Sequence, residues 1–163
     1  MGIAQDLLTL AGRLASPAPT EPEQASLRRS ISTAYYALFH LLVQEAVQNW
    51  NGSSTARIGL ERKFEHKTMK DVSNSISRSS WRGWSTPSPA VPPELEAVAR
   101  VFTKLQESRQ QADYDNAKIW ALMDAEAIVA DAQFAFDNWI KIRTLPAATE
   151  YLLSLLIGNK PSN

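Results

Sequence analysis

Cysteine is absent from this chain of 163 residues, and histidine occurs only twice, at His40 and His66. Without cysteine the chain forms no disulfide, no thiolate metal site and no cysteine nucleophile. The two histidines lie far apart in the sequence and the carboxylates are scattered, so no zinc or two-metal ligand spacing is present. We therefore expect no metal and no cofactor, and a reducing, cytoplasmic setting.

An excess of charge of either sign is also missing, because 17 basic residues balance 17 acidic ones. This balance argues against a domain that holds nucleic acid through its overall charge, although a local basic patch remains compatible with it. No segment approaches the roughly 18 uninterrupted apolar residues of a membrane span. The opening segment lacks the basic start of a signal peptide. We expect a soluble protein without membrane contact.

Strand-like alternation, a glycine-rich phosphate loop and a Gly-x-Ser-x-Gly turn are absent too. Helical spacing of apolar residues runs through most of the chain instead. It predicts an all-α bundle of about five helices with a long central helix and a short C-terminal tail helix. We divide the chain into a bundle at 1–145 and a tail at 146–163, which is a possible oligomer or partner contact.

The first helix is expected to turn one apolar stripe inward and to end near Ser16–Pro19; the stripe comprises Ile3, Leu7, Leu10, Ala11 and Leu14. The central helix spans about Thr20–Trp50. Thr20 and Glu23 have the spacing of a capping box, and Pro22 is tolerated in the first turn. Its apolar residues cover so much of its circumference that it belongs in the middle of a bundle; they include Leu27, Ile31, Ala34, Tyr35, Leu38, Leu42 and Ala46.

The remaining helices are separated by residues that start or stop helices. Ser53, Ser54 or Thr55 caps the third helix, which is expected to break near His66 because Thr68 and Asp71 form a second cap. A long loop is predicted at Ser77–Pro93, followed by a fourth helix from Leu95 to about Asp113. A fifth helix is expected to start from a cap at Asn116 and to run through Trp120 to about Arg143. A last helix begins at Pro146 and ends at Gly158.

Four polar side chains interrupt the apolar central helix at spacings of four, three and four residues: Arg29, Thr33, Tyr36 and His40. At about 100° per residue they form one narrow strip. Arg29 and His40 are roughly 16 Å apart along the helix axis, so any joint role needs neighbours from other helices. The alternative is structural, with Arg29 paired to a carboxylate and His40 satisfied at the edge of the core.

The strongest basic stretch runs from Arg57 to Lys70 and contains Lys63, with Arg62 and His66 one helical turn apart. An arginine beside an imidazole suits phosphate chemistry, because guanidinium binds phosphate oxygens while histidine transfers protons near neutral pH. The alternative is a solvated helix face with ion pairs, since acidic residues alternate with these cations.

A third group lies where the fourth helix ends, at Arg109, Asp113 and Tyr114. Arg109 is placed to bind the last carbonyls of its helix, and Asp113 to pair with an arginine from the central helix. In the predicted loop, Trp81 and Trp84 flank Arg82. These indoles suit stacking on bases or a partner, and they suit anchoring of the loop in the core equally well.

Three stretches together resemble a branch of the HEPN superfamily of small helical proteins. They are Arg28-Arg29-Ser30-Ile31-Ser32-Thr33-Ala34-Tyr35-Tyr36-Ala37-Leu38-Phe39-His40, then Arg62-Lys63-Phe64-Glu65-His66 with Met69, and Arg109-Gln110-Gln111-Ala112-Asp113-Tyr114-Asp115. The resemblance covers roughly Leu7–Arg143. It implies an antiparallel bundle of about five helices that forms a homodimer, often in a toxin–antitoxin, CRISPR-linked or phage-defence setting. A partner protein such as a nucleotidyltransferase antitoxin belongs to that expectation.

Catalytic members of that superfamily cut RNA without a metal, using an arginine and a histidine four to six residues apart. That spacing counts the residues in between, and here Arg62 and His66 have three residues between them, Arg57 and His66 have eight, and Arg29 and His40 have ten, so the strict motif is absent. The candidate catalytic residues are His66, Arg62 and His40. The candidate residues for binding RNA or a nucleotide are Arg29, Tyr36, Arg57, Lys63, Arg109, Asp113 and Tyr114. The alternative function is a non-catalytic helical protein that dimerises and binds a partner protein.

Overall fold

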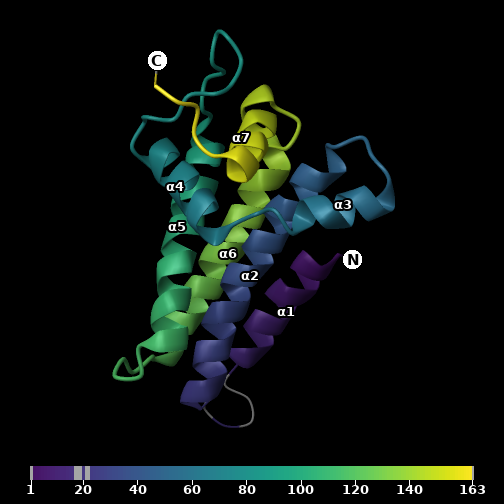
Figure 1. Cartoon of the computed structure of the whole chain (residues 1–163). Coiled ribbons are helices and arrows are strands. Elements are labelled where there is room, and N and C mark those ends of the chain that lie inside the picture. The colour runs from purple at the N-terminus through teal and green to yellow at the C-terminus, as the bar shows by residue number, and fades with distance from the viewer. Residues whose placement is uncertain (1, 17–19, 21–22, 163) are drawn as a thin grey trace. The chain divides into compact units, whose positions relative to one another are not determined.

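The computed structural model describes residues 2–16, 20 and 23–162, and its regular elements are all helices (Figure 1). In chain order they are α1 (Ile3–Leu14), α2 (Gln24–Gln48), α3 (Ser54–Glu61), α4 (His66–Ser77), α5 (Pro93–Tyr114), α6 (Leu122–Ile142) and α7 (Pro146–Ile157). The prediction of an all-α bundle is confirmed. Compared with the expected five helices and a tail helix, the added element comes from the break that separates α3 from α4.

The chain forms two compact units. Unit 1 comprises residues 1–41 and 101–136, and unit 2 comprises residues 42–100 and 137–163. Three helices, α2, α5 and α6, contribute residues to both units. The expected division at 145 and 146 stays a prediction, and α7 belongs to unit 2 together with α3 and α4.

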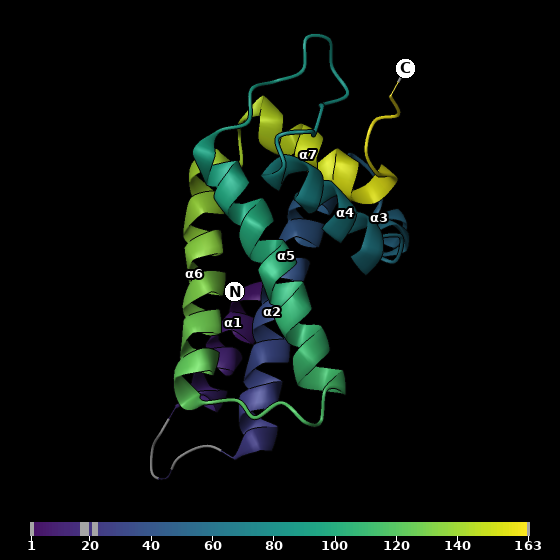
Figure 2. The same cartoon turned by 90° about the vertical axis from the view of Figure 1, so that its left-hand side faces the viewer.

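In unit 1, α1 lies beside α2 (Figures 1 and 2), and the hydroxyl of Ser30 donates a hydrogen bond of 2.8 Å to the Ala11 carbonyl. The predicted apolar stripe of α2 is buried in this unit at Leu27, Ile31, Ala34, Tyr35 and Leu38. The Tyr35 ring packs against Phe102 of α5, with 5.5 Å between the ring centroids. These contacts confirm that α2 is a core helix, as its apolar circumference indicates.

The buried face of α1 differs in part from the predicted one. Ala11 is buried as predicted, together with Ala4 and Leu8, whereas Ile3 is 48% exposed and Leu10 is 43% exposed. The sequence of α1 carries two apolar stripes at helical spacing, and the stripe with more alanine forms the contact. Alanine lets two helix backbones approach closely, as the bond from Ser30 to the Ala11 carbonyl requires.

Unit 2 has its own core, in which α4 packs against α7 (Figure 2). The hydroxyls of Ser73 and Tyr151 lie 2.8 Å apart and are both buried. The indole of Trp81 donates a hydrogen bond of 3.2 Å to the Ser154 hydroxyl, which ties the segment between α4 and α5 to α7. The expected tail helix is therefore a buried element of unit 2.

The predicted starting residues are confirmed for two helices, α3 and α7, and are wrong for three, α2, α4 and α6. Ser53 caps α3 by accepting a hydrogen bond of 3.2 Å from the Ala56 amide, and α7 begins at Pro146. However, α2 begins at Gln24, with the Leu27 amide bonded to the Glu23 carbonyl, so the predicted Thr20 capping box is wrong. Pro22 lies outside the described residues.

The other two corrections concern α4 and α6. Glu65 is the residue before α4, so the predicted cap at Thr68 and Asp71 lies inside the helix. Helix α6 begins at Leu122, not after Asn116, because the Asp115 carboxylate accepts the amides of residues 117 and 118 and holds them in a turn. Among the described helices, none is both long enough and apolar enough to cross a membrane.

The two stripes of α1 give a direct test of its packing. We expect Leu8→Ala to lower the free energy of unfolding by about 2–4 kcal/mol, because it leaves a cavity in a buried position. Leu10→Ala is the matched control, and we expect a loss below about 1 kcal/mol because that side chain remains partly in water. Urea denaturation followed by circular dichroism measures both values. A larger loss in Leu10→Ala would contradict the observed face.

Candidate functional site

The polar strip of α2 lies at the edge of the core of unit 1. Arg29 is exposed, Tyr36 and His40 are half-buried, and Thr33 is buried. His40 follows Tyr36 by one helical turn, and its ring lies 5.5 Å from the Phe39 ring in an edge-on arrangement. The strip therefore offers one exposed cation and two half-buried polar rings along a single helix.

Arg109 of α5 meets this strip. Its guanidinium carbon lies 5.3 Å from the centroid of the Tyr35 ring and 5.6 Å from that of the Tyr36 ring. These distances are within the range of cation–π attraction, which stabilises a partly desolvated cation. The Arg109 side chain is only 11% exposed, and its Nε atom is buried without a hydrogen-bond partner. The two rings therefore hold the guanidinium at a fixed place between α2 and α5.

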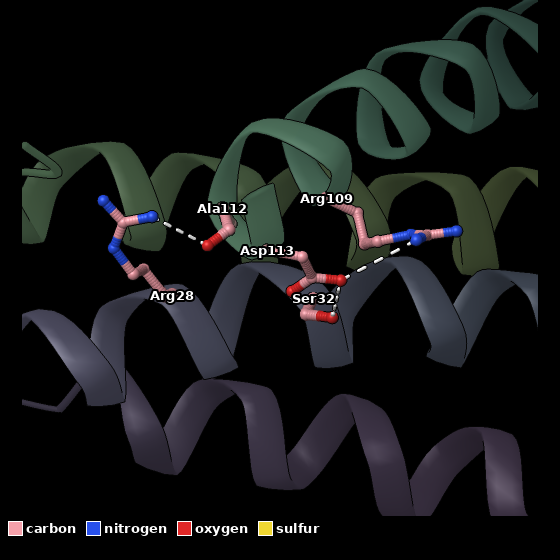
Figure 3. A network of polar contacts seen from close by, with 5 residues as sticks. All are labelled: Arg28, Ser32, Arg109, Ala112 and Asp113. Atoms are coloured by element: carbon pink, nitrogen blue, oxygen red, sulfur yellow. Dashed lines mark hydrogen bonds and ion pairs between the residues drawn. The ribbon is translucent and has the colours of Figure 1, made fainter. Parts of the chain in front are cut away.

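Asp113 completes the contact between these two helices (Figure 3). One of its carboxylate oxygens lies 3.7 Å from Arg109 Nη1 and accepts a hydrogen bond of 3.3 Å from the Ser32 hydroxyl. The carboxylate is 31% exposed, so water weakens the ion pair with Arg109. Both predicted roles need correction. Asp113 pairs with the arginine of its own helix, and its partner from α2 is a serine.

The arginine that α2 supplies to the end of α5 is Arg28. It donates hydrogen bonds of 2.8 Å to the Ala112 carbonyl, 2.9 Å to the Asp115 carbonyl and 2.5 Å to the Lys118 carbonyl (Figure 3 draws the first). The last carbonyls of a helix lack partners within the helix and carry partial negative charge, so a guanidinium stabilises them. The capping role predicted for Arg109 is therefore carried out by Arg28.

The electrostatics of this contact are visible at Tyr35. Burial raises the pKa of the Tyr35 hydroxyl well above its usual value, and the nearby charge and hydrogen bond of Arg109 offset only part of that rise. A buried phenolate loses its hydration, so the neutral form is strongly favoured. Tyr35 is therefore a core residue that supports Arg109, while the half-buried Tyr36 offers the accessible ring.

The basic stretch of unit 2 is arranged differently from the prediction. Helix α3 ends before Arg62, and α4 begins at His66, so these two residues do not lie one turn apart on a single helix. Arg62 and Lys63 are exposed, while Arg57 and His66 are half-buried. Lys67 pairs with Asp71 at 2.6 Å, which agrees with the alternative of a solvated, ion-paired surface for that part of the stretch.

The candidate residues thus form two groups. Unit 1 brings Tyr36, Arg109 and Asp113 into contact, and places His40 and the exposed Tyr114 on the same two helices. Unit 2 holds Arg57, Arg62, Lys63 and His66 around the break between α3 and α4. Of the two loop tryptophans, Trp81 is a core anchor and Trp84 is half-buried.

The sequence analysis did not identify Arg28 and Ser32 as residues that join α2 to α5. The adjacent arginines Arg28 and Arg29 indicate that one of them could reach another helix, but the sequence does not show which one. In the part of the chain that the structure describes, no cluster of three or more histidine, cysteine, aspartate or glutamate side chains is placed to hold a metal ion. Comparison of the chain with protein-family models, curated proteins and solved structures gave no match.

The three bonds of Arg28 predict a large effect on stability. We expect Arg28→Ala to lower the free energy of unfolding by about 2–4 kcal/mol, because three carbonyls lose a charged donor. Arg29→Ala at the neighbouring exposed position should change it by less than about 0.5 kcal/mol. Urea denaturation of the two variants measures the difference. Equal effects would show that the contacts of Arg28 contribute nothing beyond those of a surface arginine.

Tyr35 predicts how stability falls at alkaline pH. The folded state keeps this hydroxyl protonated, whereas the unfolded chain releases the proton above about pH 10, so rising pH favours unfolding. We expect Tyr35→Phe to reduce the downward slope of unfolding free energy above about pH 10 by about 1.4 kcal/mol per pH unit. Tyr114→Phe at an exposed tyrosine is the matched control. An unchanged slope in Tyr35→Phe would contradict the buried, neutral hydroxyl.

Proposed function

We propose that the protein is a HEPN-like protein that binds RNA or a nucleotide through one surface of unit 1. This surface, the α2–α5 surface, consists of Arg29, Tyr36 and His40 on α2, and Arg109, Asp113 and Tyr114 on α5. The observation that supports the proposal is the guanidinium of Arg109 above the half-buried Tyr36 ring, with Asp113 beside it. The arrangement unites cations, rings and a carboxylate on two helices.

Each residue of the α2–α5 surface has a role that follows from its exposure. Arg29 is exposed and carries a charge that can meet a phosphate, the dominant source of affinity for RNA. Tyr114 is 75% exposed, and an exposed aromatic ring provides a platform on which a base stacks. Arg109 already has a carboxylate partner in Asp113, so its main contribution is to fix the Tyr36 ring.

Cleavage of the bound RNA is the enzymatic form of this proposal. In a metal-independent reaction, a histidine accepts the proton of the ribose 2′-hydroxyl as that oxygen attacks the adjacent phosphate, and a cation stabilises the charge that develops. The bond from phosphorus to the 5′-oxygen breaks, the 5′-oxygen takes up a proton, and the products are a 2′,3′-cyclic phosphate and a free 5′-hydroxyl. His40 lies on the α2–α5 surface. Arg62 and His66 provide the other candidate pair in unit 2. The proposed setting is a homodimer in a toxin–antitoxin or phage-defence system.

A second candidate function is supported by an apolar cavity in unit 2. This cavity has a volume of about 330 Å³ and is lined mainly by Trp50, Leu60, Phe64, Leu152, Leu153 and Leu156. Trp50 and Leu153 also remain more than two-fifths exposed, so the apolar lining of the cavity continues onto the surface. A non-catalytic protein that binds a partner, such as a nucleotidyltransferase antitoxin, would use an apolar site of this kind.

Salt-dependent RNA binding tests the first proposal. We expect Arg29→Ala to weaken binding of single-stranded RNA and to reduce the slope of log K against log salt by about 0.7, the value for one lost phosphate contact. Arg13→Ala removes an exposed arginine from α1 and is the matched control. Fluorescence anisotropy at several salt concentrations measures the slopes. Equal slopes in both variants would remove Arg29 from the binding surface.

The same preparations, incubated with mixed RNA in EDTA, test catalysis. Cleavage that is lost in His40→Ala would place the reaction on the α2–α5 surface, whereas loss in His66→Ala or Arg62→Ala would place it in unit 2. RNA that is bound and left intact would limit the function to binding. A wild-type protein that fails to bind RNA or nucleotide even at low salt would overturn the proposal and favour the partner-binding function.

A further inference from the structure

Unit 2 contains a polar cavity of about 550 Å³. All residues of the α2–α5 surface belong to unit 1, so none of them lines this cavity. Three segments form its walls: the end of α4, the segment between α4 and α5, and the residues after α7, which turn back towards that segment (Figure 1). Its lining residues are Ser75, Ser80, Arg82, Asn159, Lys160, Pro161 and Ser162.

Hydrogen bonds hold the walls of this cavity together. The Ser75 hydroxyl lies 2.8 Å from the side-chain amide oxygen of Asn159, and Lys160 Nζ donates a bond of 3.4 Å to the Trp84 carbonyl. The amides of Ser80 and Trp81 donate to the Ser75 carbonyl at 2.9 Å and 3.0 Å. These bonds satisfy the carbonyl near the end of α4 and leave the Arg82 side chain at the cavity.

Among the described residues that line the cavity, the charged side chains are Arg82 and Lys160, and none is a carboxylate. Arg82 is exposed, and it makes no ion pair or hydrogen bond within the part of the chain that the structure describes. Two cations without a lining carboxylate create a local positive potential, although the chain as a whole is neutral.

Among the described residues, the Glu150 carboxylate interacts electrostatically with Lys160, and it lies against the backbone at Gly83 and Ser85. Its Oε2 atom accepts a hydrogen bond of 3.2 Å from the Ser85 amide. Although desolvation raises the pKa of the Glu150 carboxyl, hydrogen bonds from the side chain and backbone of Ser85 and from the backbone of Trp84, together with the charge of Lys160, lower it below its usual value overall. Glu150 therefore offsets part of the charge of Lys160, although Glu150 is not one of the residues that line the cavity.

We infer that this cavity binds a small phosphomonoester, with the phosphate held by Arg82 and Lys160. A guanidinium binds two phosphate oxygens at once, and an ammonium adds a point charge without a required direction. The hydroxyls of Ser75 and Ser80 supply further polar contacts beside these cations. A volume of about 550 Å³ is within the range of sites for small organic ligands, so it has room for the organic part of the molecule as well.

Isothermal titration calorimetry on the full chain tests this inference with ribose 5-phosphate and adenosine 5′-monophosphate as probes. We expect both to bind, and ribose and adenosine to give no heat, because the phosphate supplies the charged contacts. Arg82→Gln should weaken both probes at least about tenfold, the effect of removing one charge-assisted contact. Arg78→Gln, at an exposed arginine outside the lining, is the matched control and should bind as the wild type does.

Three results would overturn the inference. They are the absence of heat from both phosphorylated probes at millimolar concentration, equal affinity in Arg82→Gln and the wild type, and equal affinity for inorganic phosphate and the phosphomonoesters. The last would leave only a general anion site. Arg82→Gln should still bind single-stranded RNA with the wild-type slope of log K against log salt, because Arg82 belongs to unit 2 and not to the α2–α5 surface. This result distinguishes failure of the present inference from failure of the RNA-binding proposal.

Discussion

The burial of α2 in unit 1 is the constraint on which the contacts of that unit depend. Its apolar residues leave almost no surface for its polar ones, so Ser30, Ser32 and Thr33 are also buried. A buried polar group without a partner costs free energy, and each hydroxyl that finds one joins α2 to another element. Ser30 bonds to a carbonyl of α1, and Ser32 bonds to a carboxylate of α5. The hydrogen bonds of Ser30 and Ser32 thus help to select α1 and α5 as the helices that lie against α2.

The same constraint explains why two arginines of this unit have little freedom. Arg28 bonds to one carbonyl in the last turn of α5 and to two carbonyls just after that helix, and Arg109 contacts two rings and one carboxylate. A guanidinium suits such places because it stays charged, is only weakly hydrated and donates in several directions. These residues therefore position the α2–α5 surface, while the exposed Arg29 and Tyr114 are the groups still able to meet a ligand.

The sequence predicted the helices well because their signals are local. Periodic apolar residues located α2, Ser53 located the start of α3, and Pro146 and Gly158 bounded α7. The errors arose where the deciding partner is distant in sequence. Two apolar stripes on α1 are equivalent until α2 selects one, and Trp120 stays outside α6 while its amide bonds to the Gln24 side chain. Which of Arg28 and Arg29 bonds to another helix likewise depends on α5, because the Ala112 carbonyl that Arg28 reaches is 84 residues away in the sequence.

Arg82 and Arg109 show how a neutral chain can still present charge. Both are arginines near aromatic residues, yet Arg109 has a carboxylate at 3.7 Å and Arg82 has no ion-pair partner among the described residues. Because salt screens exposed charges beyond about 8 Å at physiological ionic strength, a ligand responds to the charges next to it and not to the sum over the chain. Pairing therefore makes Arg109 a structural residue with a fixed ring beside it. The absence of pairing makes Arg82 the cation with more electrostatic attraction left for an anion.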